Sequence, residues 1–520
     1  MQRRKLVMMA GALAAGAFGQ APAVVARPRH KLVLAITVDQ FRYDYLTRFR
    51  GEYSGGLARL LTQGAVFTNA FYEHTPTVTA VGHSTILSGA SPALSGIVGN
   101  DWWDRATGKE VTSVSDPSQK TLGAPERQAS SPHRMLVSTV GDEIKMAAKG
   151  ESRTIGISVK DRSAILPAGR MGDAAYWFDN ETGNFVSSTW YQKSLPGWVE
   201  TFNGKKVGER YLGVEWKAGD VLLKKMPTNA DTMFYSNLEA SPFGNELIEE
   251  FAEQAIENEK LGTHSGVDVL AVSFSCNDYV GHAEGPDSPH AHDISVRTDK
   301  LLAKFFAFVD RKVGMKNVLV VFTADHGVAP VPEVNTARKM PGGRLKDKEI
   351  GAAIEGALSA KYGAGKWLAN EKSQYVPYLD YALIAARRLD VEEVRKVAAD
   401  AVRNLPHIAR VYTKDQMIAG IPIADFVARR VHNGYYAGRS PDLVVVTEPY
   451  YMYAAKGTTH GAPFHYDAQV PVILMGAGVK PGRYHRAAAV NDIAPTLATL
   501  LDVAVPSGNM GRVLDECLTY

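Results

Sequence analysis

Leu32-Val33-Leu34-Ala35-Ile36-Thr37-Val38-Asp39 is a continuous apolar run that ends in a carboxylate. Because it does not alternate between polar and apolar residues, the run predicts a strand covered on both faces, as in a parallel sheet. Further runs of this kind lie at residues 154–159, 267–275, 318–323, 443–446 and 470–475. Helical patterns fall between them, at residues 139–149, 301–309 and 493–501. The alternation predicts an α/β fold with a doubly wound, mostly parallel central sheet flanked by helices.

Two accessory segments interrupt this rhythm. Residues from about 170 to 245 are rich in Trp, Tyr, Gly and Asn and have little helical period. Residues from about 330 to 440 contain a pattern that predicts a small β-α-β insertion, at 378–384, 391–405 and 408–413. The length fits about three domains, or equally one large α/β unit with insertions. We expect the second arrangement, with one domain over residues 27–520.

The composition is that of an ordinary globular protein of 520 residues, 45% hydrophobic and 22% charged, with two cysteines. This excludes a disordered, collagen-like or disulfide-stapled chain. The formal net charge of +3 comes from Arg3, Arg4 and Lys5, since the first 26 residues hold no acid and the remaining charges balance. A chain without net charge has no broad basic surface for nucleic acid or an anionic membrane. We therefore expect no nucleic acid as a stable partner, and a local site for any phosphate group.

Residues 1–26 have the features of an export signal peptide. Three basic residues precede an apolar run that ends near small residues, and the run is shorter than the roughly 20 residues of a spanning helix. We expect this segment to be cleaved, which predicts a periplasmic or secreted protein with no membrane attachment. The arginine pair leaves general and twin-arginine export both open. Cys276 and Cys517 are expected to be buried thiols, with one disulfide between them as the alternative.

A set of acidic and histidine side chains follows the predicted strands or lies in a glycine-containing loop. Its members are Asp39, Asp278, His282, Asp325, His326 and His460. A single Asp after a strand is more often a turn or cap residue, but in an open α/β sheet ligands bind beyond the carboxyl ends of the strands. Mixed oxygen and nitrogen donors suit Zn²⁺, and two metals can activate a nucleophile and stabilise a leaving oxygen. The set therefore predicts a site for two zinc ions.

Thr79 is the candidate nucleophile, just ahead of an apolar helical run at residues 85–87. A hydroxyl at a helix N-terminus faces unpaired amides that favour a phosphoryl group, although plain N-capping is the alternative role. Lys160 and Arg162 follow the strand at 154–159, and from an extended segment both can point toward the oxygens of a terminal phosphate. A solvated surface pair is the alternative there. Asn100 can add an uncharged hydrogen bond.

These pieces occur in a fixed order along the chain. They are Asp39, Thr79-Ala80-Val81-Gly82-His83, Gly99-Asn100, Lys160-Asp161-Arg162, Asp278-x-x-x-His282, Ala324-Asp325-His326-Gly327 and Thr459-His460-Gly461. The ordered set resembles the alkaline phosphatase superfamily, and within it the monomeric threonine-nucleophile (PafA-like) bacterial branch, which is related to type I phosphodiesterases and nucleotide pyrophosphatases. The resemblance extends from about residue 31 to residue 505.

The resemblance implies a role for each residue. It implies that one zinc ion, which also contacts Thr79, is held by Asp39, Asp325 and His326. It implies that the second zinc ion is held by Asp278, His282 and His460. It implies that the non-bridging phosphoryl oxygens are bound by Asn100, Lys160 and Arg162. Thr79 would attack phosphorus to give a phosphothreonine intermediate.

The function that the resemblance implies is that of a zinc-dependent alkaline phosphatase, a monomeric hydrolase of small phosphate monoesters. A phosphodiesterase or nucleotide pyrophosphatase with the same two metals is the first alternative. Lys160 and Arg162 favour the monoesterase, because a diester has one fewer terminal charge and a second substituent. A non-catalytic phosphate-binding protein is the remaining alternative.

Overall fold

Strand β1 (Leu32–Val38) lies inside a ten-stranded sheet, between β12 (Asp268–Phe274) and β13 (Val318–Thr323), and pairs in parallel with both. All of its residues are buried, as the continuous apolar run predicts. The structure, a computed structural model, describes residues 30–519. The predicted export signal at residues 1–26 lies outside the described residues.

The central sheet is mostly parallel. From one edge to the other its strands are β19 (Gly482–Tyr484), β2 (Ala65–Phe67), β18 (Val472–Met475), β13, β1, β12, β7 (Thr154–Ser158), β8 (Ala174–Asp179), β9 (Asn184–Ser188) and β6 (Thr121–Leu122). The five strands from β13 to β8 run in parallel, whereas β18 and β9 are antiparallel to their neighbours. The carboxyl ends of β1, β7, β12 and β13 therefore meet at one edge.

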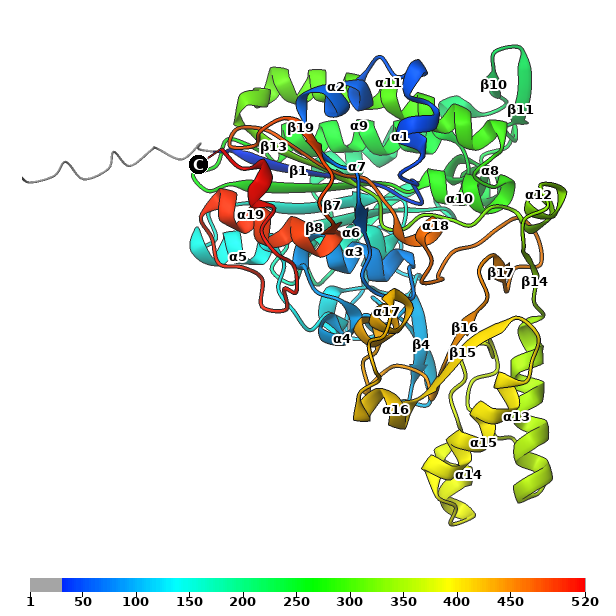
Figure 1. Cartoon of the computed structure of the whole chain (residues 1–520). Coiled ribbons are helices and arrows are strands. Elements are labelled where there is room, and N and C mark those ends of the chain that lie inside the picture. The colour runs from blue at the N-terminus through cyan, green and yellow to red at the C-terminus, as the bar shows by residue number, and fades with distance from the viewer. Residues whose placement is uncertain (1–29, 520) are drawn as a thin grey trace, which may run out of the picture.

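Helices cover both faces of this sheet (Figure 1). One layer contains α2 (Gly56–Gln63), α9 (Pro242–Asn258) and α11 (Pro289–Lys312). The opposite layer contains α3 (Thr79–Ser88), α5 (Val140–Ala147), α6 (Asp161–Ala168) and α19 (Ile493–Leu501). The prediction of a doubly wound α/β fold flanked by helices is confirmed. Among the described residues, no helix is both long and apolar enough to cross a membrane.

A segment between β13 and β18 projects from the sheet and is drawn from yellow-green to gold in Figure 1. It contains α13 (Asp347–Tyr362), α14 (Tyr381–Ala386), α15 (Val391–Arg403), β15 (Ile408–Thr413), α16 (Lys414–Ala419), α17 (Phe426–Gly434) and β16 (Leu443–Thr447). We call residues 345–447 the inserted segment. Its helices α13 and α15 pack on each other around a separate apolar core that includes Ile354 and Val394.

Two predictions for this segment are wrong. The expected strand at 378–384 is largely the helix α14, because the Asp380 carboxylate accepts a hydrogen bond from Leu383 N and caps it. The run at 443–446 is a strand, but it pairs antiparallel with β15 and not with the central sheet. Only part of β16 is buried, as expected of a strand with one covered face.

Candidate active site

The candidate residues gather where the parallel strands end. Asp39 follows β1, Lys160 follows β7, and Asp325 with His326 follows β13. The helix α10 (Cys276–Glu284) begins two residues after β12 and carries the remaining pair, Asp278 and His282. The structure thus brings together on adjacent strands the side chains that the sequence separates by more than 200 residues.

Thr79 does not serve as an N-cap. Val78 occupies that position, Thr79 is the first helical residue of α3, and its hydroxyl makes no capping hydrogen bond. The hydroxyl oxygen instead lies 3.5 Å from the Nε2 atom of His326, and the side chain is almost fully buried. The helix approaches this closely because Gly82 has no side chain, since a Cβ there would lie 2.1 Å from the carbonyl oxygen of Asp325.

The three candidate histidines share one orientation. The Nδ1 atom of each lies near a backbone carbonyl oxygen: His282 near Thr458 O at 2.8 Å, His326 near Gly327 O at 2.9 Å, and His460 near Thr77 O at 2.8 Å. A carbonyl oxygen only accepts, so each Nδ1 donates, and a ring that is neutral presents the lone pair of Nε2 to the site. In protein metal sites, the ring nitrogen of a histidine that does not bind the metal usually donates to an acceptor in this way, which fixes the orientation of the ring.

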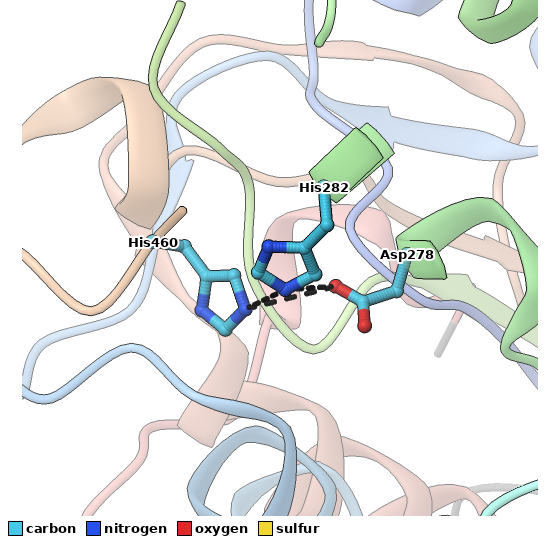
Figure 2. A group of neighbouring side chains, drawn as sticks. All are labelled: Asp278, His282 and His460. Atoms are coloured by element: carbon cyan, nitrogen blue, oxygen red, sulfur yellow. Dashed lines mark hydrogen bonds and ion pairs between the residues drawn. The ribbon is translucent and has the colours of Figure 1, made fainter. Parts of the chain in front are cut away.

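The first group of donors consists of Asp278, His282 and His460 (Figure 2). The Nε2 atoms of the two histidines are 3.1 Å apart, and they lie 3.2 and 3.6 Å from the Oδ1 atom of Asp278. Burial lowers the pKa of His460, and the neighbouring His326 and His282 lower it further, which favours the neutral ring that a metal requires. A cation between these atoms would satisfy lone pairs that otherwise face one another.

The second group surrounds the Nε2 atom of His326. Asp39 Oδ1 lies 3.5 Å from it and Asp325 Oδ2 lies 3.3 Å from it. Asp39 Oδ1 is buried and accepts no hydrogen bond from the described residues. Burial and the carboxylate of Asp325 raise the pKa of Asp39, and the nearby Lys160 ammonium offsets this only in part. Asp278 is also close to Asp39 and His326, so by distance it belongs to both groups.

Lys160 lies inside this cluster. Its Nζ atom is 2.9 Å from Asp39 Oδ2 and 2.6 Å from Asp278 Oδ2, and the three side chains are almost fully buried. Burial disfavours the charged ammonium, but the carboxylates of Asp278 and Asp39 outweigh that effect and raise the pKa of Lys160. The ammonium group therefore stays charged and supplies positive charge where the two groups of donors meet.

Arg162 and Asn100 lie at the edge of the cluster. The expected extended segment is wrong for Arg162, because α6 begins at Asp161 and places Arg162 in its first turn. The Nε atom of Arg162 is buried and has no hydrogen-bond partner among the described residues. Asn100 accepts a 2.9 Å hydrogen bond from Ala80 N, the second residue of α3. This bond uses the amide oxygen of Asn100, so the amide NH₂ group remains available as a donor.

Two residues that the sequence analysis did not assign to the site contact its acidic side chains, Asp278 and Asp325. Gln40 has a left-handed backbone with φ of 61°, donates from its backbone N to Asp325 Oδ1 at 3.1 Å, and donates from Nε2 to Asp278 Oδ1 at 2.6 Å. The Nδ1 atom of His83 lies 3.3 Å from Asp325 Oδ2. The only signals in the sequence for these roles are that Gln40 follows Asp39 and that His83 lies one helical turn after Thr79.

Comparison with known proteins agrees with this arrangement. The family model described as type I phosphodiesterase / nucleotide pyrophosphatase matches residues 33–467. The chain is 35% identical to alkaline phosphatase PafA of Elizabethkingia meningoseptica, over 94% of this chain and 95% of that protein. It is 36% identical to alkaline phosphatase PhoV of Synechococcus elongatus, over 96% of this chain and 94% of that protein. It is also 36% identical to a protein of Myroides odoratus named calcium-transporting ATPase, over 94% of each.

A solved structure has the same fold. The crystal structure of wild-type alkaline phosphatase PafA superposes with a TM-score of 0.88 and 35% sequence identity, and the match covers 95% of this chain and all of that one. The similarity therefore includes the inserted segment as well as the sheet.

Proposed function

This chain belongs to the type I phosphodiesterase / nucleotide pyrophosphatase family, and we propose that within this family it is an exported alkaline phosphatase. It would hydrolyse small phosphate monoesters to an alcohol and inorganic phosphate, through a phosphothreonine intermediate on Thr79. Relatives at 35–36% identity over nearly the whole chain carry the name alkaline phosphatase, which supports the choice of activity.

The observation that carries the proposal is the environment of the Thr79 hydroxyl. It caps no helix, is buried, and lies 3.5 Å from a histidine at the centre of a carboxylate cluster. A buried hydroxyl beside such a cluster fits a nucleophile better than a structural threonine does. The N-terminus of α3 also favours a phosphoryl group at Thr79, although Ala80 N already donates to Asn100 Oδ1.

We assign two zinc ions to the site. The donors fit this metal, because three histidines present Nε2 lone pairs and the buried Asp39 Oδ1 lacks a donor. Asp39, Asp325 and His326 would hold the ion next to Thr79, and Asp278, His282 and His460 would hold the other. When bound, the two ions lower the pKa of the attacking hydroxyl and stabilise negative charge on the leaving oxygen.

In the first step the Thr79 hydroxyl loses its proton and its oxygen forms a bond to phosphorus, while the bond from phosphorus to the substrate oxygen breaks and that oxygen gains a proton to leave as the alcohol. Lys160, Arg162 and Asn100 would bind the non-bridging oxygens, and the N-terminus of α3 orients the phosphoryl group. In the second step water attacks phosphorus, the oxygen of Thr79 leaves, and inorganic phosphate is released. Gln40 contributes by holding Asp278 and Asp325 in place.

A phosphodiesterase is the second candidate, because the matching family model carries that description. The charges at the site favour the monoesterase. Lys160 and Arg162 suit a terminal phosphate with two negative charges, whereas a diester brings one negative charge and a second substituent. Diester hydrolysis would then be a minor activity of the same site.

The test measures kcat/KM for an aryl phosphate and its methyl diester in wild type, Thr79→Ser and Thr79→Ala. We expect the wild type to prefer the monoester, Thr79→Ser to retain turnover, and Thr79→Ala to lose at least about 10³-fold in kcat. Mass spectrometry of an acid-quenched reaction should detect a phosphoryl group on Thr79 in the wild type.

Thr85→Ala is the matched control, because Thr85 lies in the same helix and its hydroxyl donates only to the carbonyl oxygens of Val81 and Ala90. Its turnover should stay within about threefold of wild type. A diester preference would replace the proposal by the phosphodiesterase. Full turnover by Thr79→Ala would remove Thr79 as the nucleophile, and an inactive protein that binds no zinc would favour a non-catalytic phosphate-binding protein.

We further propose that residues 1–26 are an export signal and that residues 27–520 form one catalytic unit in the periplasm or outside the cell. That unit would act as a monomer, without nucleic acid or membrane as a partner. The basic and apolar pattern of the first residues and the balanced charge of the rest support this.

A further inference from the structure

A cavity of about 340 Å³ adjoins the candidate active site. Its lining includes Asn100, which the proposed function assigns to phosphoryl binding, and His460, which it assigns to a metal. A molecule in this cavity would therefore lie next to the proposed phosphoryl and metal sites. The volume lies near the lower end of the roughly 300–1,000 Å³ typical of small-molecule sites.

Aromatic side chains form part of the walls. Among them are Trp102, Trp103, Tyr375, Tyr378, Tyr435 and Tyr453. They come from the hairpin of β4 (Asp101–Asp104) and β5 (Lys109–Thr112) that follows Asn100, and from the inserted segment and the loop after it. The cavity therefore lies between the sheet domain and the inserted segment.

Two of these rings form a flat surface. Tyr375 and Tyr453 stack with centroids 4.8 Å apart and an interplanar angle of 9°, and both are half-buried. A stacked pair with one accessible side offers an apolar plane to a further ring. Aromatic contacts of this kind contribute more binding free energy than burial of their apolar area alone.

The cavity holds little charge. Among the described residues that line it, the ionisable acids and bases other than tyrosine and His460 are Asp101, Glu110, Lys372 and Asp467. Three of these four are acidic, and Asp467 is buried and accepts a hydrogen bond from Ala462 N. Such a lining disfavours a second phosphate group and suits an uncharged, apolar group.

We propose that this cavity binds the alcohol portion of the substrate and selects phosphate monoesters whose alcohol carries a planar aromatic ring. Tyr375 and Tyr453 are the specificity-determining residues, and the inserted segment supplies most of the subsite. This inference rests on the proposed phosphomonoesterase function, because it takes Asn100 as the phosphoryl end of the cavity.

The test uses two phosphonates that cannot be hydrolysed, methylphosphonate and benzylphosphonate, and measures their dissociation constants by calorimetry on the zinc-loaded protein. We expect benzylphosphonate to bind about tenfold more tightly than methylphosphonate in the wild type. Tyr375→Ala and Tyr453→Ala should each reduce that ratio by about three- to tenfold. Methylphosphonate has no ring to stack, so its affinity for these two variants should stay close to its affinity for the wild type.

Two further variants make the test decisive. Tyr362→Ala removes a tyrosine of the inserted segment that does not line the cavity, so the ratio should stay as in the wild type. Val376→Trp adds bulk at a half-buried lining position and should abolish the preference, whether or not the tyrosine variants fold.

The outcomes separate this inference from the proposed function. If the protein hydrolyses monoesters but binds both phosphonates equally, or if the ratio is the same in all variants, the cavity is not the subsite and the phosphatase proposal stands. If the protein hydrolyses no monoester and binds neither phosphonate, both proposals are wrong.

Discussion

At the residue scale, Lys160 contacts both groups of candidate metal-ligating side chains, through Asp39 and Asp278. We predict that Lys160→Met, which keeps most of the volume but removes the charge, destabilises the protein strongly in a chelator. Two buried carboxylates would lose their shared cation, and breaking a buried ion pair costs about 3–5 kcal/mol. Zinc would supply the missing positive charge, so the zinc-induced rise in Tm should be larger in the variant than in wild type. Scanning calorimetry with chelator and with zinc measures both values.

Lys145→Met is the matched control, because Lys145 forms a single ion pair with Asp173 away from the cluster, at 2.7 Å. Its zinc-induced rise in Tm should equal that of wild type. Equal rises in Lys160→Met and wild type would contradict the view that the ammonium and the metals share the carboxylates.

The sequence predicted which residue types gather at this site, but not how they are held. Asp39 and Asp325 could be assigned because an acid directly after a buried strand has a known place in an open sheet. Gln40 could not be assigned, because its role depends on a left-handed backbone conformation that directs its backbone N–H toward Asp325. Lys160 was expected at the phosphate, whereas its position between two carboxylates depends on β7 and β12 being neighbours in the sheet.

At the element scale, the approach of α3 to the end of β13 controls the geometry of Thr79. We predict that Gly82→Ala lowers kcat by at least about 100-fold and destabilises the protein by about 1–3 kcal/mol. The added Cβ would meet the Asp325 carbonyl oxygen at 2.1 Å, and because this atom belongs to the backbone the helix must move away. Turnover and urea unfolding measure the two effects.

Gly356→Ala is the control for the loss of a glycine in a helix. Gly356 is exposed within α13, and a Cβ there meets nothing within 4 Å, so the change should stabilise the protein by about 0.5–1 kcal/mol and leave turnover unchanged. Wild-type turnover in Gly82→Ala would mean that the spacing between α3 and β13 does not position Thr79.

Elements buried on both faces were the most predictable. β1 and β13 have the predicted bounds, since a continuous apolar run of this length allows few alternatives. Two helix starts were predicted less well. The carboxylate of Asp380 caps α14, where the apolar run predicted a strand, and α6 begins at Asp161, one residue before Arg162, without a side-chain cap. A short apolar run fits a strand and a buried helix equally well, and the cap decides between them.

At the scale of the whole molecule, the chain has more than one apolar core. The largest surrounds the central sheet, and a separate one within the inserted segment includes Ile354, Trp367 and Val394. Polar contacts join the two parts, among them the ion pair of Arg105 in the sheet domain with Asp442, which is fully buried. The proposed alcohol subsite lies at this junction, so its shape depends on both cores.

We predict that Ile354→Ala loosens the inserted segment without loosening the sheet. Ile354 is fully buried in the separate core, and such a truncation costs about 2–5 kcal/mol. Hydrogen exchange should accelerate over residues 345–447 while β1, β12 and β13 keep their protection, and benzylphosphonate should lose its advantage over methylphosphonate. Ile155→Ala in β7 is the control, because it lies in the core of the sheet and should accelerate exchange there. Uniform acceleration in Ile354→Ala would mean that both cores unfold as one cooperative unit, and that the inserted segment cannot change the substrate preference independently of the sheet.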